Sequence, residues 1–133
     1  MFKTKSSKPQ LKIESLIGED TVIEGNILFT GGLRIDGVVK GNVCSTDEKV
    51  TTLELSENAK IEGQIRVSHA MLNGTVVGPV FGSEFVELLP KSKVTGDVHY
   101  NNLEIHLGAL IQGNLVHEEK IEEEPQEKKQ VNS

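Results

Sequence analysis

A five-residue unit, apolar-x-Gly-x-apolar, recurs along this chain of 133 residues and limits what the chain can fold into. Residues 33–43 hold two such units, which are centred on Gly37 and Gly41 and share Val39. Eight of the 13 glycines stand at the centre of a unit: Gly25, Gly37, Gly41, Gly63, Gly74, Gly78, Gly96 and Gly113. In an extended chain, residues at i−2, i and i+2 point to one side, so the apolar pair and the glycine face away from their mostly polar neighbours. Each unit therefore predicts a short strand with one buried and one solvent-exposed face.

The glycines also predict how the strands are connected. A glycine on the buried side weakens an ordinary strand, so its recurrence indicates a corner where no side chain fits or where φ is positive. Neighbouring units form clusters, such as the pair centred on Gly37 and Gly41. The last glycines of successive clusters are 16, 22, 15, 18 and 17 residues apart: Gly25, Gly41, Gly63, Gly78, Gly96 and Gly113. Repeats this short predict a β-solenoid in which each coil stacks on the previous one. A coil of roughly 17 residues has a contour of roughly 55 Å, which is enough for three short sides around a narrow lumen.

Alternating runs between the glycine units, at residues 53–55, 86–88 and 103–105, are expected to form the other sides. The longest interval contains the polar block 45–49, which predicts a loop at one corner. Residues 11–17 also alternate and predict a leading strand laid on the first coil. Pro79 has no N–H to donate and is expected at a corner or a bulge. The outward residues Asn26, Asn42 and Gln64 occupy equivalent positions and predict a short amide ladder.

Length and composition fit one domain with two tails. Hydrophobic residues make up 36% and aromatic residues 4% of the chain, which suits a lumen of stacked Ile, Val and Leu. We expect a flexible basic tail at 1–15, the β-helix core at 16–116 and an acidic disordered tail at 117–133. Cys44 is the single cysteine, which excludes an intramolecular disulfide. With no secretory signal and no run long enough to span a bilayer, the expected compartment is the cytoplasm.

The distribution of charge argues against nucleic acid as a partner. The net charge is −6, with +3 in residues 1–16, −3 in residues 117–133 and the remaining −6 in the core between them. An acidic core does not form the basic groove that binds phosphates. We therefore expect no nucleic-acid partner.

The order of the glycine units resembles that of the bactofilins, polymer-forming bacterial cytoskeletal proteins. The resemblance covers roughly residues 16–116, and residues 17–27, 33–43 and 94–105 carry it. It implies an all-β fold: a single-stranded, right-handed, three-sided parallel β-helix of about six coils between disordered tails. It also implies self-assembly end to end without nucleotide. The implied role is a scaffold at the inner face of the cytoplasmic membrane that helps to organise cell-wall synthesis or remodelling and cell shape. The implied partners are further copies of the chain, the membrane surface and peptidoglycan-remodelling enzymes or their membrane partners.

The ends of the predicted solenoid are candidate polymerisation surfaces. Solenoids normally cover the apolar cross-section of their end coils with a cap. The sequence contains no amphipathic helix at either terminus to provide one. The expected interface residues are apolar residues of the first and last coils: Ile17, Leu107, Leu110, Ile111 and Leu115.

The extreme N-terminus is a second candidate site. Met1 and Phe2 are followed by Lys3 and Lys5. This pattern resembles the short membrane-targeting segment of many bactofilins. Apolar burial of Phe2 and attraction of the lysines to anionic lipid would act together.

No catalytic, metal or cofactor site is predicted. His69, His99, His106 and His117 fall on different coils or in the tail without ligand spacing, and we expect surface histidines without a shared role. Cys44 is expected to be a small corner or core residue.

Two other solenoid classes remain open. The first is a left-handed hexapeptide-type acyltransferase, which would show contiguous hexads, whereas these coils vary in length. The second is a surface-binding solenoid, which would need a flat Thr-rich face, whereas the outward residues here carry mixed charges.

Overall fold

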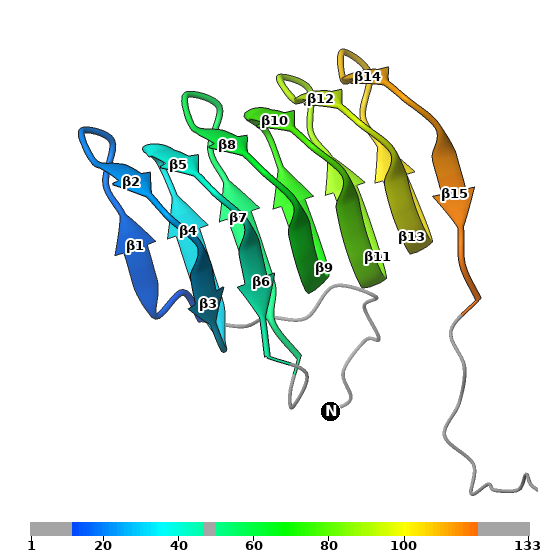
Figure 1. The fold of residues 1–133 in the computed structure, drawn as a ribbon. Helices are drawn as coiled ribbons and strands as arrows, with labels where there is room; N and C mark the ends of the chain where they lie inside the picture. The colour runs from blue at the N-terminus through cyan, green and yellow to red at the C-terminus, as the bar shows by residue number, and fades with distance from the viewer. Residues whose placement is uncertain (1–11, 47–49, 120–133) are drawn as a thin grey trace, which may run out of the picture.

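The computed structural model describes residues 12–46 and 50–119. All regular structure in these residues is β-strand, and no helix occurs among them. Figure 1 shows the strands arranged as a stack of similar turns, with β1 in the first turn and β15 in the last. Every strand pair is parallel.

One side of the stack is a six-stranded sheet, with one strand from each coil. Its strands are β2 (Val22–Glu24), β5 (Val38–Lys40), β8 (Lys60–Glu62), β10 (Thr75–Val77), β12 (Lys93–Thr95) and β14 (Leu110–Gln112). Each strand pairs with the next at offsets of 16, 22, 15, 18 and 17 residues, read from the partners Val22, Val38, Lys60, Thr75, Lys93 and Leu110. These offsets equal the spacing of the glycines.

The other two sides belong to one nine-stranded sheet that bends at a corner. Its strands are β1 (Ser15–Ile17), β3 (Ile27–Phe29), β4 (Gly32–Ile35), β6 (Val43–Ser45), β7 (Thr52–Leu55), β9 (Ile65–Leu72), β11 (Val80–Leu88), β13 (Val98–Ile105) and β15 (Leu115–His117). The long strand β9 pairs with β6 through its first residues and with β7 through its last ones, so it runs along two sides of its coil. The predicted all-β parallel solenoid of about six coils is confirmed. Its right-handed sense stays a prediction.

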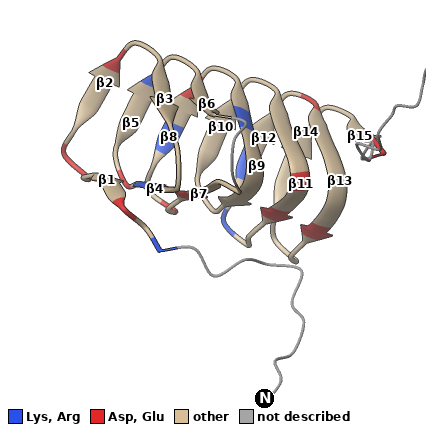
Figure 2. Ribbon diagram, turned by 90° about the horizontal axis from the view of Figure 1, so that it is seen from below, with Lys and Arg blue, Asp and Glu red and all other residues tan. Residues whose placement is uncertain are grey.

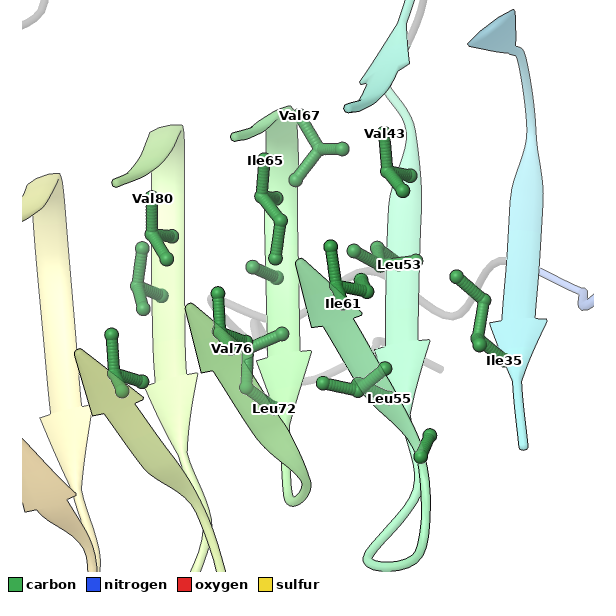
Figure 3. Close-up of a cluster of buried hydrophobic side chains, with 14 of the residues drawn as sticks. Ile35, Val43, Leu53, Leu55, Ile61, Ile65, Val67, Leu72, Val76 and Val80 are labelled. Atoms are coloured by element: carbon green, nitrogen blue, oxygen red, sulfur yellow. The ribbon is translucent and has the colours of Figure 1, made fainter. Parts of the chain in front are cut away.

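Columns of apolar side chains fill the lumen. One column runs through Ile35, Leu55, Leu72 and Leu88, which are paired in register on successive coils and are at most 2% exposed. Val39, Ile61, Val76 and Val94 form a second column, and Val43, Ile65, Val80 and Val98 form a third. Figure 3 shows Leu55, Leu72 and several neighbours inside the stack. Burial of each such side chain contributes about 1.5–3 kcal/mol to stability.

A ladder of glycines lies at the corner that follows the six-stranded sheet. A Cβ added to Gly96 would collide with the carbonyl oxygen of Gly78 in the coil before, and Gly96 has a φ of +144°, which other residues rarely adopt. The same collision recurs along the ladder at Gly41, Gly63, Gly78 and Gly113, each against the glycine one coil earlier. Gly37 and Gly74 lie at the corner before the six-stranded sheet, in short turns. A Cβ added to either glycine would collide with backbone carbonyl oxygens in the longer turn of the coil before.

Several local predictions can be compared with the structure. Pro79 lies between β10 and β11, so its place at a corner is confirmed. The leading strand is present but short, since β1 begins at Ser15 and pairs with β4. Ser45 of the polar block ends β6, and the rest of the block falls between β6 and β7, at a corner, with residues 47–49 outside the described part. The predicted tails at 1–15 and 117–133 also lie largely outside it.

The predicted amide ladder bonds differently from expectation. The side-chain oxygen of Asn26 accepts from the backbone N–H of Asn42 at 2.9 Å, and Asn42 accepts from Gln64 in the same way at 2.9 Å. Asp97 and Asn114 repeat the contact in the last coils, also at 2.9 Å. The bonds run from side chain to backbone because each Asx residue directly follows a ladder glycine, and the next coil presents its N–H there. Pro79 occupies the same position without an N–H, which interrupts the ladder.

Candidate polymerisation surfaces at the two ends of the solenoid

Both ends of the solenoid leave strands with a hydrogen-bonded neighbour on one side only, as far as the described residues extend. At the first coil, β1, β2 and β3 pair only with β4, β5 and β6. At the last coil, β14 pairs only with β12 and β15 only with β13. Figure 1 shows these two sets at opposite ends of the stack. Such edges present backbone N–H and C=O groups to which another chain can bond.

The lumen columns also reach solvent at both ends. Ile105 continues the leucine column and is 43% exposed, and Leu115 continues the third column and is 45% exposed. Ile17, Ile23 and Ile27 hold the corresponding places in the first coil and are only partly buried. Their counterparts in the inner coils are almost fully buried. Apolar surface that is sealed inside the stack is therefore open at its two mouths.

The structure separates the five predicted interface residues into two groups. Ile17, Ile111 and Leu115 end lumen columns, as a polymerisation surface built on the lumen requires. Leu110 pairs with Lys93 on the outward side of its sheet and is 57% exposed. Leu107 lies between β13 and β14 and is 96% exposed. Leu107 and Leu110 therefore lie outside the apolar cross-section, because strand alternation turns Leu110 outward and Leu107 lies in a turn. The part that the five residues play in polymerisation stays a prediction.

The first coil carries an apolar outer rim that was not predicted from the sequence. Leu16, Val22 and Leu28 point outward and are 61%, 56% and 72% exposed. In each case the outward residue stands beside an inward one, as in the pairs 16–17, 22–23 and 27–28. This doubling of apolar residues departs from strict alternation and was the signal for outward apolar residues; it also occurs at 76–77 and 110–111, where Val77 and Leu110 are likewise exposed.

The expectation of surface histidines is wrong for one of the four residues, His69. His69 is 7% exposed, and its Nδ1 lies 3.0 Å from the hydroxyl of Ser68. That hydroxyl donates to the carbonyl of Thr51 at 2.7 Å, so the group belongs to the packing of a corner. His106 lies beside two carboxylates, Glu87 and Glu104, from two coils. Register between coils brings these three residues together although they are not adjacent in sequence.

On the outer surface, aromatic and charged side chains stack along the axis. The guanidinium of Arg66 lies 4.1 Å from the ring centre of Phe81, and the ring of Phe81 stacks on His99 at 4.3 Å. Nδ1 of His99 contacts Glu118 at 2.8 Å. A groove of about 440 Å³ lies along this stack. Figure 2 shows acidic and basic residues interspersed along the coils.

The predicted membrane-targeting residues Met1, Phe2, Lys3 and Lys5 lie outside the described part of the chain. Within that part, no helix is long and apolar enough to span a membrane. Cys44 points outward from β6 and is half-buried, and its thiol forms no disulfide.

Comparison with known proteins places this geometry in a family. A family model described as "Bactofilin: Polymer-forming cytoskeletal" matches residues 15–116, which span β1 to β15. The chain belongs to the bactofilin family.

Individual bactofilins agree with this assignment. The chain is 30% identical over 105 residues to bactofilin BacO of Myxococcus xanthus, covering 79% of this chain and 80% of BacO. It is 28% identical over 99 residues to bactofilin BacP of the same organism, covering 73% of this chain and 41% of BacP. Its fold is similar to that of Thermus thermophilus bactofilin in double helical filaments, with a TM-score of 0.57 and 29% identity over 79% of this chain and all of that one. The acyltransferase alternative gains no support from these comparisons.

Proposed function

We propose that this bactofilin is a non-enzymatic scaffold that assembles without nucleotide into filaments through the ends of its solenoid. The observation that carries the proposal is the pair of mouths that residues 12–46 and 50–119 leave uncovered, where lumen residues such as Leu115 are half exposed. The Thermus thermophilus relative, which forms double helical filaments, supports an end-to-end assembly of this fold.

The physical driving force is the completion of the stack. A second copy at a mouth would bond to the free strand edge and bury the exposed ends of the lumen columns. Removing apolar surface from water contributes about 25 cal/mol per Å². Several half-exposed Ile and Leu side chains would be covered at once, together with the backbone groups of three strands. No step in this process needs the hydrolysis of a nucleotide.

A matched pair of substitutions tests the interface. Leu115 and Val77 are both 45% exposed, but Leu115 ends a lumen column whereas Val77 points outward from β10 in the middle of the stack. We expect Leu115→Arg to give a soluble monomer and Val77→Arg to form filaments like the original chain. Negative-stain electron microscopy and sedimentation, both without nucleotide, measure the outcome. Unchanged filaments from Leu115→Arg would refute assembly through this end.

We place the filaments at the inner face of the cytoplasmic membrane. Met1 and Phe2 beside Lys3 and Lys5 resemble the membrane-targeting segment of other bactofilins and support this part of the proposal. In a flotation assay with anionic vesicles, Phe2→Glu should remove binding while filaments remain. Equal flotation of the Phe2→Glu filaments would argue against the segment.

The proposed role at the membrane is to organise cell-wall synthesis or remodelling and thereby cell shape. The partners would be peptidoglycan-remodelling enzymes or membrane proteins bound to them. Labelling of new wall material in cells that lack the protein should show a displaced pattern of incorporation. A pattern identical to that of the parent cells would count against a wall-directed role.

A further inference from the structure

We propose that Glu87, Glu104 and His106 form a binding site for a zinc-class divalent cation that joins the last two coils. One potential ligand atom from each residue lies within 4.8 Å of the other two. Nε2 of His106 is 2.7 Å from Oε2 of Glu87 and 3.2 Å from Oε2 of Glu104. Glu104 and His106 flank Ile105, which ends the leucine column at the lumen mouth, and the site shares no residue with the aromatic stack on the outer surface.

The backbone holds the three residues in place. Glu87 in β11 and Glu104 in β13 are direct partners in the parallel ladder, so their side chains leave the sheet side by side. Figure 2 shows the acidic ends of these two strands next to each other. His106 follows β13 at the start of a turn, where its N–H donates to the carbonyl of Leu88 at 2.9 Å and its carbonyl accepts from Ala109 at 3.1 Å. The imidazole therefore extends from a fixed point over the two carboxylates.

The distances fit a small tetrahedral ion. Zn²⁺ is bound at about 2.0–2.2 Å by imidazole nitrogen and carboxylate oxygen, so neighbouring ligand atoms lie roughly 3.3 Å apart. The 3.2 Å distance from His106 to Glu104 is close to this value, and the 2.7 Å contact with Glu87 is a hydrogen bond that would lengthen by roughly 0.6 Å when the ion binds. A single imidazole N–H can point straight at only one of the two carboxylates, whereas a cation between them contacts all three ligand atoms.

Burial and charge favour the same assignment. The side chain of Glu87 is 4% exposed, while those of Glu104 and His106 are 45% and 34% exposed. The site thus has a buried inner ligand and a side that is open to solvent, where a water molecule would complete the coordination. Two carboxylates directly opposite each other in a sheet repel, and a divalent cation would remove this repulsion. An imidazole among the ligands favours zinc over magnesium or calcium, which prefer oxygen alone.

A bound ion would hold the end of the solenoid together. Glu87 belongs to the fifth coil, and Glu104 and His106 belong to the sixth. The turn that His106 begins also contains Leu107, and β14 with Leu110 follows it directly. Zinc would therefore stabilise the last coil, which on the proposed function is also an assembly surface. The binding itself does not depend on assembly, so its test is independent of filament formation.

Calorimetric titration of the full chain, free of any histidine tag, with zinc chloride near neutral pH tests the site. We expect one zinc ion per chain. Glu104→Gln and His106→Asn should each weaken binding about tenfold or more. Glu104 is half exposed, so its substitution should leave the fold intact. His99→Asn is the matched control, since His99 contacts a single carboxylate, Glu118, and belongs to no three-ligand cluster in the described residues.

Thermal unfolding gives a second readout. Zinc should raise the melting temperature of the original chain and of His99→Asn, and should leave that of His106→Asn unchanged. Magnesium at the same concentration should have no effect on any of them. Three results would overturn the proposal: no stoichiometric zinc binding, equal zinc affinity in all variants, or equal binding of magnesium.

Discussion

At the scale of single residues, the corner glycines carry two constraints at once. The positive φ of Gly96 disfavours every residue with a Cβ, and the carbonyl oxygen of Gly78 occupies the place where that Cβ would stand. Gly25 shares the unusual φ, but an added Cβ there would meet nothing within 4 Å, because Gly25 lies in the first coil that the described residues form. The requirement for glycine in the inner ladder is therefore a consequence of stacking.

The first prediction concerns this ladder. Gly96→Ala should destabilise the solenoid by about 3 kcal/mol, since overpacking against backbone and a left-handed φ each cost about 1–3 kcal/mol. Gly18→Ala is the control, because its Cβ would meet only the hydroxyl oxygen of Thr21 at 4.0 Å. Urea unfolding followed by circular dichroism measures both. If Gly18→Ala lowered the free energy of unfolding as much as Gly96→Ala, crowding at the ladder would not be the cause of the destabilisation.

The second prediction concerns the Asx ladder. Asn42→Ala removes the acceptor for the N–H of Gln64, and we expect the free energy of unfolding to fall by about 1 kcal/mol. Asn114→Ala should cost much less, because Asn114 stands in the last coil and its own N–H keeps Asp97 as partner. Both substitutions are compared by urea unfolding in the Leu115→Arg chain, so that no second copy covers the last coil. Equal losses would contradict a role for bonds between coils.

At the scale of the element, stability resides in columns that cross the strands. Leu72 is 0% exposed and lies between Leu55 and Leu88 in its column. Leu72→Ala should cost about 2–5 kcal/mol, because neighbours in a rigid stack cannot collapse into the cavity. Leu110→Ala removes the same atoms from a side chain that is 57% exposed, and we expect less than about 0.5 kcal/mol. Similar losses for the two variants, measured by urea unfolding, would contradict the column as the unit of packing.

The elements also explain why the fold was predictable and the histidine cluster was not. Glycine spacing gave the coil lengths directly, because each ladder glycine stacks on the one before it. Between the fifth and sixth coils this spacing is 17 residues, from Gly96 to Gly113, which places Glu87 opposite Glu104 as the register shows. His106 lies in the turn after β13, outside the paired strands, so the register between coils does not say where its imidazole points. Ligand spacing was sought along the chain and not between coils, and the cluster was therefore not predicted.

The outer rim of the first coil was missed for a different reason. Outward positions were assumed to be polar, as most of them are in the inner coils. Leu16, Val22 and Leu28 break that rule on all three strands of the first coil, and Val77 and Leu110 break it on single strands farther along. Local alternation predicts which side a residue faces, but the meaning of an apolar outward residue depends on its place along the whole stack.

At the scale of the whole molecule, assembly and membrane binding should depend on each other. A single N-terminal segment offers one Phe side chain, worth about 1.5–3 kcal/mol on burial, and lysines worth about 1 kcal/mol each near an anionic leaflet. The entropy of ordering the segment reduces this sum. One copy would therefore bind weakly, whereas a filament that presents many copies binds by avidity without any new contact.

The last prediction tests this dependence by flotation with anionic vesicles, since free filaments sediment whereas vesicle-bound ones rise. The original chain and Val77→Arg should float, and Leu115→Arg should stay at the bottom although its N-terminal segment is intact. Raising the salt concentration should release the filaments gradually, because the attraction to the lysines is screened. If monomeric Leu115→Arg floated as completely as the original chain, a single segment would be sufficient for binding, and the coupling of assembly to the membrane would be wrong.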